Sequence, residues 1–433
     1  MRAAFKKRST TLAAILTAAA ATVFVYPDWI KIADEGQTFS IPLAQIVRYG
    51  SGSNWIEKPV ASAGSCTNEF FGNDPIVGTV KECQVKKALS ITIPDPVPTG
   101  PTDHHTGIIA DLSALPAFQP GIATTLLSSA TPLAPLPSAG DWEHDGKFRT
   151  VCNVSHYSYD DPIVFPGQAG YAHLHTFFGN TGIDADTTSA NIRTVGNATC
   201  RGGTINLSGY WVPAMIDTSN NRPVVPRTIL IYYATGLWTY MDDGSQMMPF
   251  PAGLKMVTGD AKATTAVNPG NYTCMMLGPG YARAGLEGVS SIPTCVTTED
   301  ELWMIVKFPQ CWDGVNLDSP NHRSHMAFPE ENPNPHAAGR AYRCPTSHPV
   351  VIPEIKYQIM FTVPSPASNM ANWKLASDNY VGLGGYSIHG DWMNGWDQTI
   401  ADAWVLSCVR ARRDCGTAQL ADGRTTLGFQ GNE

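Results

Sequence analysis

Several signatures of well-known enzyme classes are missing from this 433-residue sequence. It contains no GxSxG, GxGxxG, P-loop or HExxH motif, so an α/β-hydrolase, a dinucleotide- or nucleotide-binding enzyme and an ordinary metalloprotease all lose their main support. It also lacks a CxxC pair, which argues against a thiolate zinc knuckle and a thioredoxin-like redox motif. Any chemistry has to be inferred from less standard residue patterns.

Charged residues are scarce, at 15% of the chain, and the net charge is −8. The lysines and arginines are scattered rather than clustered, so nucleic acid is not an expected partner. Long helical patterns are also few, whereas glycine, proline, threonine, serine and asparagine are abundant. This balance predicts a β-rich extracellular protein with many turns and loops.

Long apolar runs are absent beyond the N-terminus, so we expect no transmembrane domain there. Residues 1–27 place four basic side chains ahead of an apolar run from Leu12 to Val25, which is the layout of a secretory signal. Tyr26 and Pro27 make a poor cleavage site, so an uncleaved N-terminal anchor is the alternative. In both cases the sequence predicts a secreted protein, extracellular or periplasmic.

The ten cysteines all follow the predicted signal, and their even number is typical of an exported protein stabilised by disulfides. We therefore expect five disulfides. The simplest connectivity joins each cysteine to its nearest neighbour in the chain, although the sequence leaves other pairings open. That connectivity pairs Cys66 with Cys83, Cys152 with Cys200, Cys274 with Cys295, Cys311 with Cys344, and Cys408 with Cys415.

Changes in composition divide the chain into three parts after the signal. Residues 37–93 are predicted to form a small β module, and residues 94–140 a proline-rich linker, because proline interrupts both helices and central strands. Residues 141–433 form the main domain, for which we expect a mainly β, β-sandwich-like fold with long disulfide-tied loops. The best helix signal is DQTIADAWVLSCVRARRD near the C-terminus, pinned by Cys408 and Cys415.

Two histidine pairs are the most informative feature of the main domain. His173 and His175 lie in AHLHTFFGN, and His322 and His325 lie in CWDGVNLDSPNHRSHMAFP. If HLH is extended, its two imidazoles project from one face about 7 Å apart along the backbone, and Leu174 faces the core. If the two pairs meet, they form a site with three or four nitrogens, which suits zinc or copper. A divalent metal is therefore the candidate cofactor, with these four histidines as its candidate ligands.

Two other roles stay open for these histidines: metal-free acid–base or sugar-binding chemistry, and a structural role in which each ring ties loops together by hydrogen bonds. HxH spacing is a moderate signal, and HxxH without a glutamate is not the zinc-protease motif. Asp160 and Asp161 precede Pro162, where capping a turn is the default role. Paired acids near HLH could also orient its imidazoles.

A third segment, SIHGDWMNGWDQ, mixes acids with tryptophans and glycines. Aromatic rings stack on sugar faces while acids hold sugar hydroxyls, so this mixture suits glycan recognition. The alternative is a corner of buried tryptophans. These two interpretations apply to His389, Asp391, Trp392 and Trp396, and also to Trp312 in CWDG.

The order of the motifs resembles one known family. The chain carries, in this order, DDPIVFPG, HLHTFFGN, GYWVPA, IYYATG, MPFPAGLKM, FPQCWDGVNLDSPNHRSHMAFP, CPTSHPVVIPEIKYQIMF and HGDWMNGWD. Over roughly residues 150–408 this order resembles the DUF1996 family of secreted fungal and bacterial proteins. The family has no assigned function. Some fungal members are joined to WSC modules, which are thought to bind glycans, so the resemblance implies a carbohydrate context.

These features lead to two hypotheses. The first is an exported enzyme, a hydrolase or lyase, that cleaves a polysaccharide or cell-wall glycan. In it a histidine, metal-assisted or not, acts as general base, and an acid orients it or protonates a leaving oxygen. The second is a non-catalytic glycan-binding or cell-wall structural protein. The candidate catalytic residues are His173, His175, His322, His325, His389, Asp313 and Asp391, and the candidate substrate-binding residues are Trp312, Trp392, Trp396 and Arg323.

Overall fold

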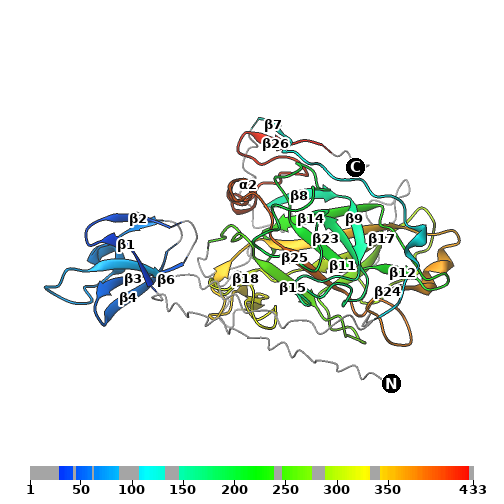
Figure 1. Ribbon diagram of the computed structural model, residues 1–433, viewed down its shortest axis with the longest axis horizontal. Coiled ribbons are helices and arrows are strands. Elements are labelled where there is room, and N and C mark those ends of the chain that lie inside the picture. The colour runs from blue at the N-terminus through cyan, green and yellow to red at the C-terminus, as the bar shows by residue number, and fades with distance from the viewer. Residues whose placement is uncertain are drawn as a thin grey trace, which may run out of the picture. The chain divides into compact units, whose positions relative to one another are not determined.

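The chain divides into a small N-terminal unit and a larger main unit (Figure 1). The computed structural model describes residues 29–41, 45–60, 63–86, 107–131, 146–237, 246–275, 288–331 and 342–428. The predicted signal or anchor, residues 1–27, lies outside these residues. Within them, no helix is both long enough and apolar enough to cross a membrane.

The N-terminal unit is built on a four-stranded antiparallel sheet around the disulfide between Cys66 and Cys83. Its first strand, WIKIAD, precedes residue 37, where the sequence predicted the module to begin, because this segment pairs with Glu82–Lys86 near the end of the unit. The sheet order is β1 (Trp29–Asp34), β6 (Glu82–Lys86), β3 (Gln45–Ser51) and β4 (Asn54–Val60), and the unit also holds β2 (Thr38–Ser40), β5 (Ala63–Ser65) and helix α1 (Asn68–Phe71).

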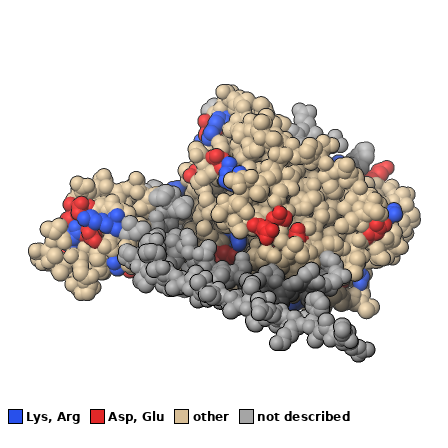
Figure 2. All heavy atoms as spheres, viewed as in Figure 1, with Lys and Arg blue, Asp and Glu red and all other residues tan. Residues whose placement is uncertain are grey.

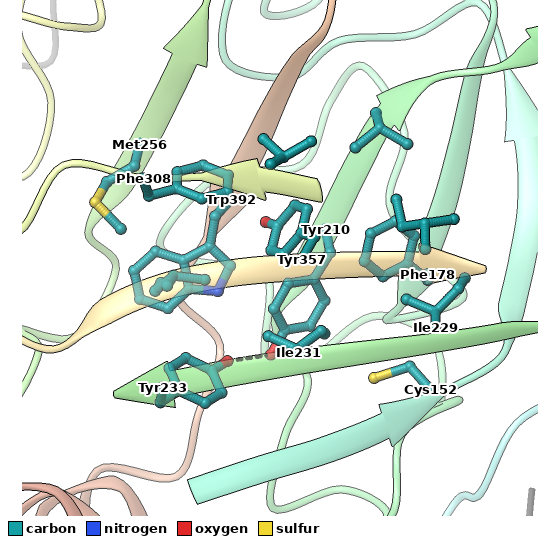
Figure 3. Close-up of a cluster of buried hydrophobic side chains, with 14 of the residues drawn as sticks. Cys152, Phe178, Tyr210, Ile229, Ile231, Tyr233, Met256, Phe308, Tyr357 and Trp392 are labelled. Atoms are coloured by element: carbon teal, nitrogen blue, oxygen red, sulfur yellow. Dashed lines mark hydrogen bonds between the residues drawn. The ribbon is translucent and has the colours of Figure 1, made fainter. Parts of the chain in front are cut away.

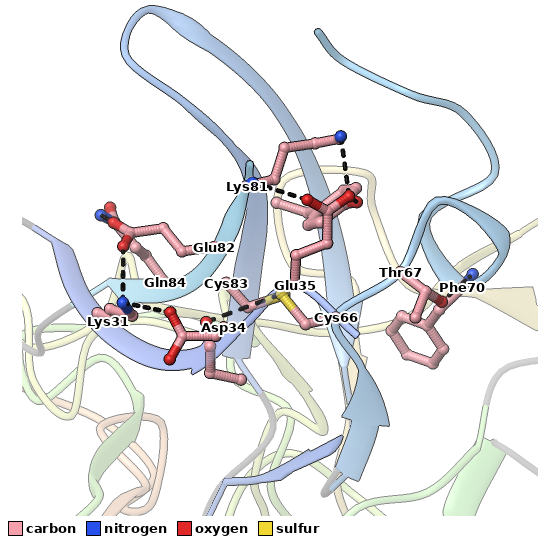
Figure 4. Close-up of a disulfide and its surroundings, with 12 residues drawn as sticks. Lys31, Asp34, Glu35, Cys66, Thr67, Phe70, Lys81, Glu82, Cys83 and Gln84 are labelled. Carbon is pink, nitrogen blue, oxygen red and sulfur yellow. Dashed lines mark hydrogen bonds and ion pairs between the residues drawn. A yellow bond between two sulfur atoms is a disulfide. The ribbon is translucent and has the colours of Figure 1, made fainter. Parts of the chain in front are cut away.

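A buried lysine ties the loops of this unit together (Figure 4). The Lys81 side chain is 4% exposed, and its ammonium lies 2.9 Å from a Glu35 carboxylate oxygen and 3.3 Å from one of Asp74. The Tyr49 hydroxyl donates a hydrogen bond to Glu35 at 2.8 Å. The hydrogen bonds from Lys81 and Tyr49 lower the pKa of Glu35 to about 2, since they favour its charged form.

The main unit contains two five-stranded antiparallel sheets. Sheet 1 has the order β15 (Lys255–Gly259), β25 (His389–Met393), β11 (Gly209–Pro213), β10 (His175–Gly179) and β9 (Val154–Ser158). Sheet 2 has the order β16 (Asn271–Met275), β17 (Glu301–Lys307), β23 (Glu354–Thr362), β14 (Thr228–Ala234) and β8 (Lys147–Cys152).

The two sheets pack through one aromatic and aliphatic core (Figure 3). Tyr210 and Trp392 project into it from sheet 1, and Tyr233 and Tyr357 from sheet 2. Hydrogen bonds join the sheets as well: the hydroxyls of Tyr210 and Tyr233 lie 2.7 Å apart, and the Tyr357 hydroxyl donates to the backbone carbonyl of Asp391 at 2.7 Å. The predicted mainly β, sandwich-like fold is confirmed.

Gly390 shows why β25 can carry polar residues on its other face. A Cβ atom at this position would lie 2.9 Å from Val306 and 3.3 Å from Phe308 of the facing layer. Only a residue without a side chain therefore allows sheet 2 to approach so closely. Because side chains alternate along a strand, His389 and Asp391 point away from sheet 2.

Smaller elements surround the sandwich. They are β7 (Leu127–Ser129) with β26 (Arg424–Thr426), β12 (Met215–Asp217) with β13 (Arg222–Pro223) and β24 (Trp373–Leu375), β18 (Cys311–Trp312) with β19 (Met326–Ala327) and β22 (Val350–Val351), β20 (Glu330–Glu331) with β21 (Tyr342–Arg343), and the 3₁₀ turns η1 (Leu112–Ala114) and η4 (Ala367–Asn372). Charged side chains are interspersed and sparse on the face shown in Figure 2.

The predicted C-terminal helix is present. It runs as α2 (Gln398–Trp404) and continues as the π-helical segment η5 (Val405–Arg410). Asp397 caps its first turn by accepting a hydrogen bond from the Ile400 amide at 3.2 Å. All five disulfides follow the nearest-neighbour pairing, so that prediction is confirmed. The 408–415 bridge pins the end of this helix, and such five-disulfide chains are typical of an oxidising, extracellular environment.

The predicted linker differs from what the structure shows. Residues 107–131, inside the proline-rich stretch, run along the main unit and are held there by backbone hydrogen bonds. Ile122 bridges Ala198, and β7 pairs with β26 near the C-terminus. Proline prevents this stretch from forming a central strand, but it does not prevent an extended segment from pairing at an edge.

The lysine network of the N-terminal unit makes its stability depend on pH. Because the pKa of Glu35 is lowered, its contribution is present above the ordinary glutamate pKa and is lost as the pH falls toward 2. We expect Glu35→Gln to lower the Tm of this unit most above about pH 5 and hardly at all near pH 2. Scanning calorimetry of the full chain across this range measures the difference. Glu57→Gln, an exposed change on β4, is the control; a Glu35 effect that stays constant with pH would contradict the ion-pair explanation.

Candidate functional site

The outer face of sheet 1, away from sheet 2, carries the residues that converge. His175 on β10 pairs with Pro213 on β11, and Trp211 of β11 pairs with Asp391 of β25. Extending the second register by two residues brings His389 level with Pro213. His175 and His389 therefore lie in one row across three strands, with Asp391 in the next row on the same face.

Three imidazoles meet at this place. The Nε2 atoms of His173 and His389 lie 3.0 Å apart, and the ring centroids of His173 and His175 are separated by 4.2 Å. One nitrogen from each of His173, His175 and His389 lies within 4.8 Å of the others. The prediction that the HLH imidazoles share a face is confirmed, and Leu174 between them is buried in a small apolar cluster.

The backbone fixes the protonation of two of these rings. Nδ1 of His175 lies 2.9 Å from the carbonyl oxygen of Asp160, and Nδ1 of His389 lies 2.7 Å from that of Ser387. A carbonyl only accepts, so Nδ1 carries the proton in both rings and Nε2 presents its lone pair to the cluster. Burial lowers the pKa of His175 to about 3 and that of His389 to about 4, so both are neutral at pH 7.

Two carboxylates complete the cluster. Ligand atoms of Asp161, His175 and Asp391 also lie within 4.8 Å of one another. Asp161 accepts hydrogen bonds from the amides of Ile163 and Val164 at 3.0 and 2.9 Å, so it caps its turn as the sequence predicted and also lies at the site. Burial raises the pKa of Asp161 to about 6.

Asp391 differs from Asp161 because no hydrogen bond from the described residues offsets its burial. It is 1% exposed, and neither carboxylate oxygen has a hydrogen-bond partner among the residues that the structure describes. Nε2 of His175 is likewise buried and has no partner among them. Burial and the neighbouring Asp161 raise the pKa of Asp391 well above its usual range. The Arg323 charge acts in the opposite direction. The cluster thus contains buried polar atoms that form no hydrogen bond with the described residues.

The second histidine pair does not join the first as a ligand set. Both ring nitrogens of His325 are used elsewhere: Nε2 lies 2.7 Å from the Lys255 carbonyl oxygen and Nδ1 lies 3.0 Å from the Ser319 hydroxyl. Nδ1 of His322 lies 3.0 Å from Asp318. His325 is therefore a buried structural residue that anchors its loop to β15. The expected set of four histidines is not formed; His389 joins His173 and His175 instead.

The loop that carries His322 nevertheless acts on the cluster. The charge of His322 lowers the pKa of Asp161, and the charge of the exposed Arg323 lowers those of His389 and Asp391, although burial dominates all three values. His322 and Arg323 therefore influence the site electrostatically rather than as members of the cluster.

Asp313 belongs to a turn and not to the cluster. Its carboxylate accepts hydrogen bonds from the backbone amides of Val315 and Asn316 at 2.8 and 2.9 Å and from the Asn316 side chain at 2.6 Å. Those bonds make Asp313 an Asx-type cap of its turn. The sequence could not separate this role from catalysis, because an aspartate in a glycine-containing loop suits both.

The predicted sugar-binding tryptophans are buried. Trp312, Trp392 and Trp396 are 5%, 0% and 2% exposed. The Trp396 indole N–H donates to the Tyr233 hydroxyl at 2.9 Å, and that of Trp312 donates to the Asn316 carbonyl at 2.7 Å. With no exposed ring face, none of the three can stack on a sugar in this conformation, and the alternative of a buried tryptophan corner describes them better.

A comparison with protein families places the cluster in a known group. The family model for DUF1996, a domain of unknown function, matches residues 161–396, more than half of the chain. The chain belongs to the DUF1996 family. The five residues of the cluster, Asp161, His173, His175, His389 and Asp391, all lie within the DUF1996 match. No solved structure matches the chain.

The burial of Trp396 leads to a test of its role. We expect Trp396→Ala to reduce the free energy of unfolding by about 3–5 kcal/mol, because it removes a large core ring and leaves a cavity. Denaturant unfolding of the full chain measures this loss. Trp303→Ala, at a half-buried position on β17, should cost less. A loss below about 1 kcal/mol would show that Trp396 is not a core residue.

Proposed function

We propose that this DUF1996 protein is an exported, carbohydrate-associated enzyme that uses the His/Asp cluster to cleave a polysaccharide or cell-wall glycan. The observation that carries the proposal is the convergence of His173, His175, His389 and two aspartates from separate segments on one face of sheet 1. A histidine that only ties loops uses both ring nitrogens, as His325 does. His175 does not, because its Nε2 has no hydrogen-bond partner in the described part of the chain.

The chemistry follows from the fixed tautomers. A neutral imidazole with an unprotonated Nε2 is a general base, and the backbone carbonyls at Nδ1 hold His175 and His389 in that form. Asp161 and Asp391 are then the acids that orient an imidazole or protonate a leaving oxygen. Cleavage by hydrolysis needs this base to activate water, and cleavage by elimination needs it to remove a carbon-bound proton.

We place substrate contact at His173 and Arg323. His173 is the most exposed of the three histidines, at 8%, so the approach is from its side. Arg323 is exposed and its charge reaches His389 and Asp391, which suits binding of a polar sugar chain beside them. A glycan substrate also agrees with the carbohydrate context of the DUF1996 proteins that are joined to WSC modules. The five disulfides agree with export.

A non-catalytic glycan-binding or cell-wall structural protein is the second candidate. One observation favours it: His175 is fully buried and His389 is 4% exposed, which is a degree of burial more typical of a structural centre than of an open active site. In that case the cluster would stabilise the fold, and glycan contact would lie elsewhere.

A cleavage screen separates the two candidates. The full chain is incubated with a panel of plant, fungal and bacterial wall polysaccharides, with new reducing ends reporting hydrolysis and ultraviolet absorbance of unsaturated ends reporting elimination. We expect turnover by the wild type and a loss of about 10²–10⁴-fold in His173→Ala, because a general base or its neighbour is removed. His348→Ala, outside the cluster, should keep full activity.

The unfolding temperature of each variant has to be measured beside its activity. A folded His173→Ala protein without turnover supports the enzyme. Glycan binding without turnover in the wild type, unchanged in His173→Ala, would support the binding or structural protein instead.

A further inference from the structure

We infer that His173, His175, His389 and Asp391 form a site for a single divalent transition-metal ion, zinc or copper. Either a catalytic or a structural centre would hold such an ion. The cluster contains buried polar atoms without partners among the described residues, and two of its rings are held with Nε2 directed inward.

Burial of Asp391 is energetically costly without a charged partner. A carboxyl group that is 1% exposed, with both oxygens unpaired among the described residues, loses its hydration in either protonation state and gains no hydrogen bond in exchange. The second carboxylate nearby, Asp161, adds negative charge and is already held by two backbone amides. A bound cation offsets this burial directly, whereas further hydrogen bonds from the protein are absent among the described residues.

Two of the imidazoles are oriented as metal ligands are. His175 and His389 each donate Nδ1–H to a backbone carbonyl, which leaves both Nε2 lone pairs directed at the cluster. This arrangement, in which the far nitrogen is hydrogen-bonded and the near one is free, is the usual outer support of metal-binding histidines. Ser387, whose carbonyl holds His389, is itself fixed because its hydroxyl donates to Asp378 at 2.6 Å.

Hydrogen bonding between the imidazoles would satisfy only some of the polar atoms in the cluster. His173 could donate from Nε2 to Nε2 of His389, since these atoms are 3.0 Å apart. That bond leaves Nε2 of His175 and both oxygens of Asp391 without partners. An ion bound at Nε2 of His175 would lie between the two groups and give these unpaired atoms a partner.

The donor set fixes the number and the class of ion. The groups His173–His175–His389 and Asp161–His175–Asp391 meet at His175, whose Nε2 is the one nitrogen it can offer, so we place one ion at the cluster with that nitrogen as the common ligand. Three imidazoles and one carboxylate suit zinc or copper, whereas calcium and magnesium prefer sites made of oxygens. Asp161 then lies beside the ion as a neighbouring carboxylate.

Metal content is the direct test. The full chain, exported by its host and freed of any histidine tag, is analysed by inductively coupled plasma mass spectrometry for zinc and copper. We expect close to one equivalent in the wild type and in the control His348→Ala. Asp391→Asn and His389→Ala should lower the affinity at least about 100-fold and lose the ion during dialysis against a weak chelator.

A second measurement decides the question even if a variant fails to fold. The wild type is stripped with a strong chelator and then titrated with zinc chloride or copper chloride while its Tm is followed. We expect saturation at one equivalent and a rise in Tm of more than about 5 °C. A stripped protein whose Tm ignores both metals, or an Asp391→Asn protein that binds as the wild type does, would overturn the site.

The two proposals fail separately. One equivalent of metal with no cleavage of any polysaccharide would retain the ion and reject the enzyme. Cleavage that survives complete removal of metal would retain the enzyme and show that the cluster works as an acid–base centre alone.

Discussion

The packing of sheet 1 against sheet 2 is the constraint on which the candidate site depends. Trp392 enters the shared core and Gly390 lets the second layer come close, so the residues between and beside them must face the other way. His389 and Asp391 thus gain their place from an apolar contact in which they take no part. The same alternation on β10 sends Phe178 inward and His175 outward. Hydrophobic burial on one face therefore sets the polar geometry on the other.

Local features of the fold and site could be predicted because they depend on short stretches of chain. The shared face of His173 and His175 follows from the two-residue period of a strand, and the nearest-neighbour disulfides join cysteines that short loops bring together. Short-range patterns could not show that His389 is the third histidine of the cluster. His389 reaches His175 only because β11 lies between their strands, and strand order is a property of the whole sheet. The sequence instead favoured His322 and His325 as the further metal ligands.

Polar and aromatic residues were harder to assign, because the same residue type serves packing and chemistry. The alternation in HGDWM shows that Asp391 and Trp392 lie on opposite faces, but not which of those faces is covered by the second sheet. Solvent on the tryptophan side would have produced a sugar platform; sheet 2 lies there instead and produces a core. Asp161 shows the reverse ambiguity, since the turn-capping role that its sequence predicts also delivers its carboxylate to the cluster.

The segment 107–131 has a practical consequence for dissecting this protein. Ile108 donates its amide to the Ala376 carbonyl at 2.9 Å, and a Cβ on Gly107 would lie 3.2 Å from that of His173, so the segment begins beside the cluster. Farther along, the Leu427 amide donates to the Leu126 carbonyl at 2.9 Å, which fastens it to the last described strand. A fragment cut at residue 141, where the composition changes, would lose the residues that lie beside His173 and the strand that pairs with β26. A shortened version of the main unit should therefore retain residues 107–131 together with the C-terminal strand β26.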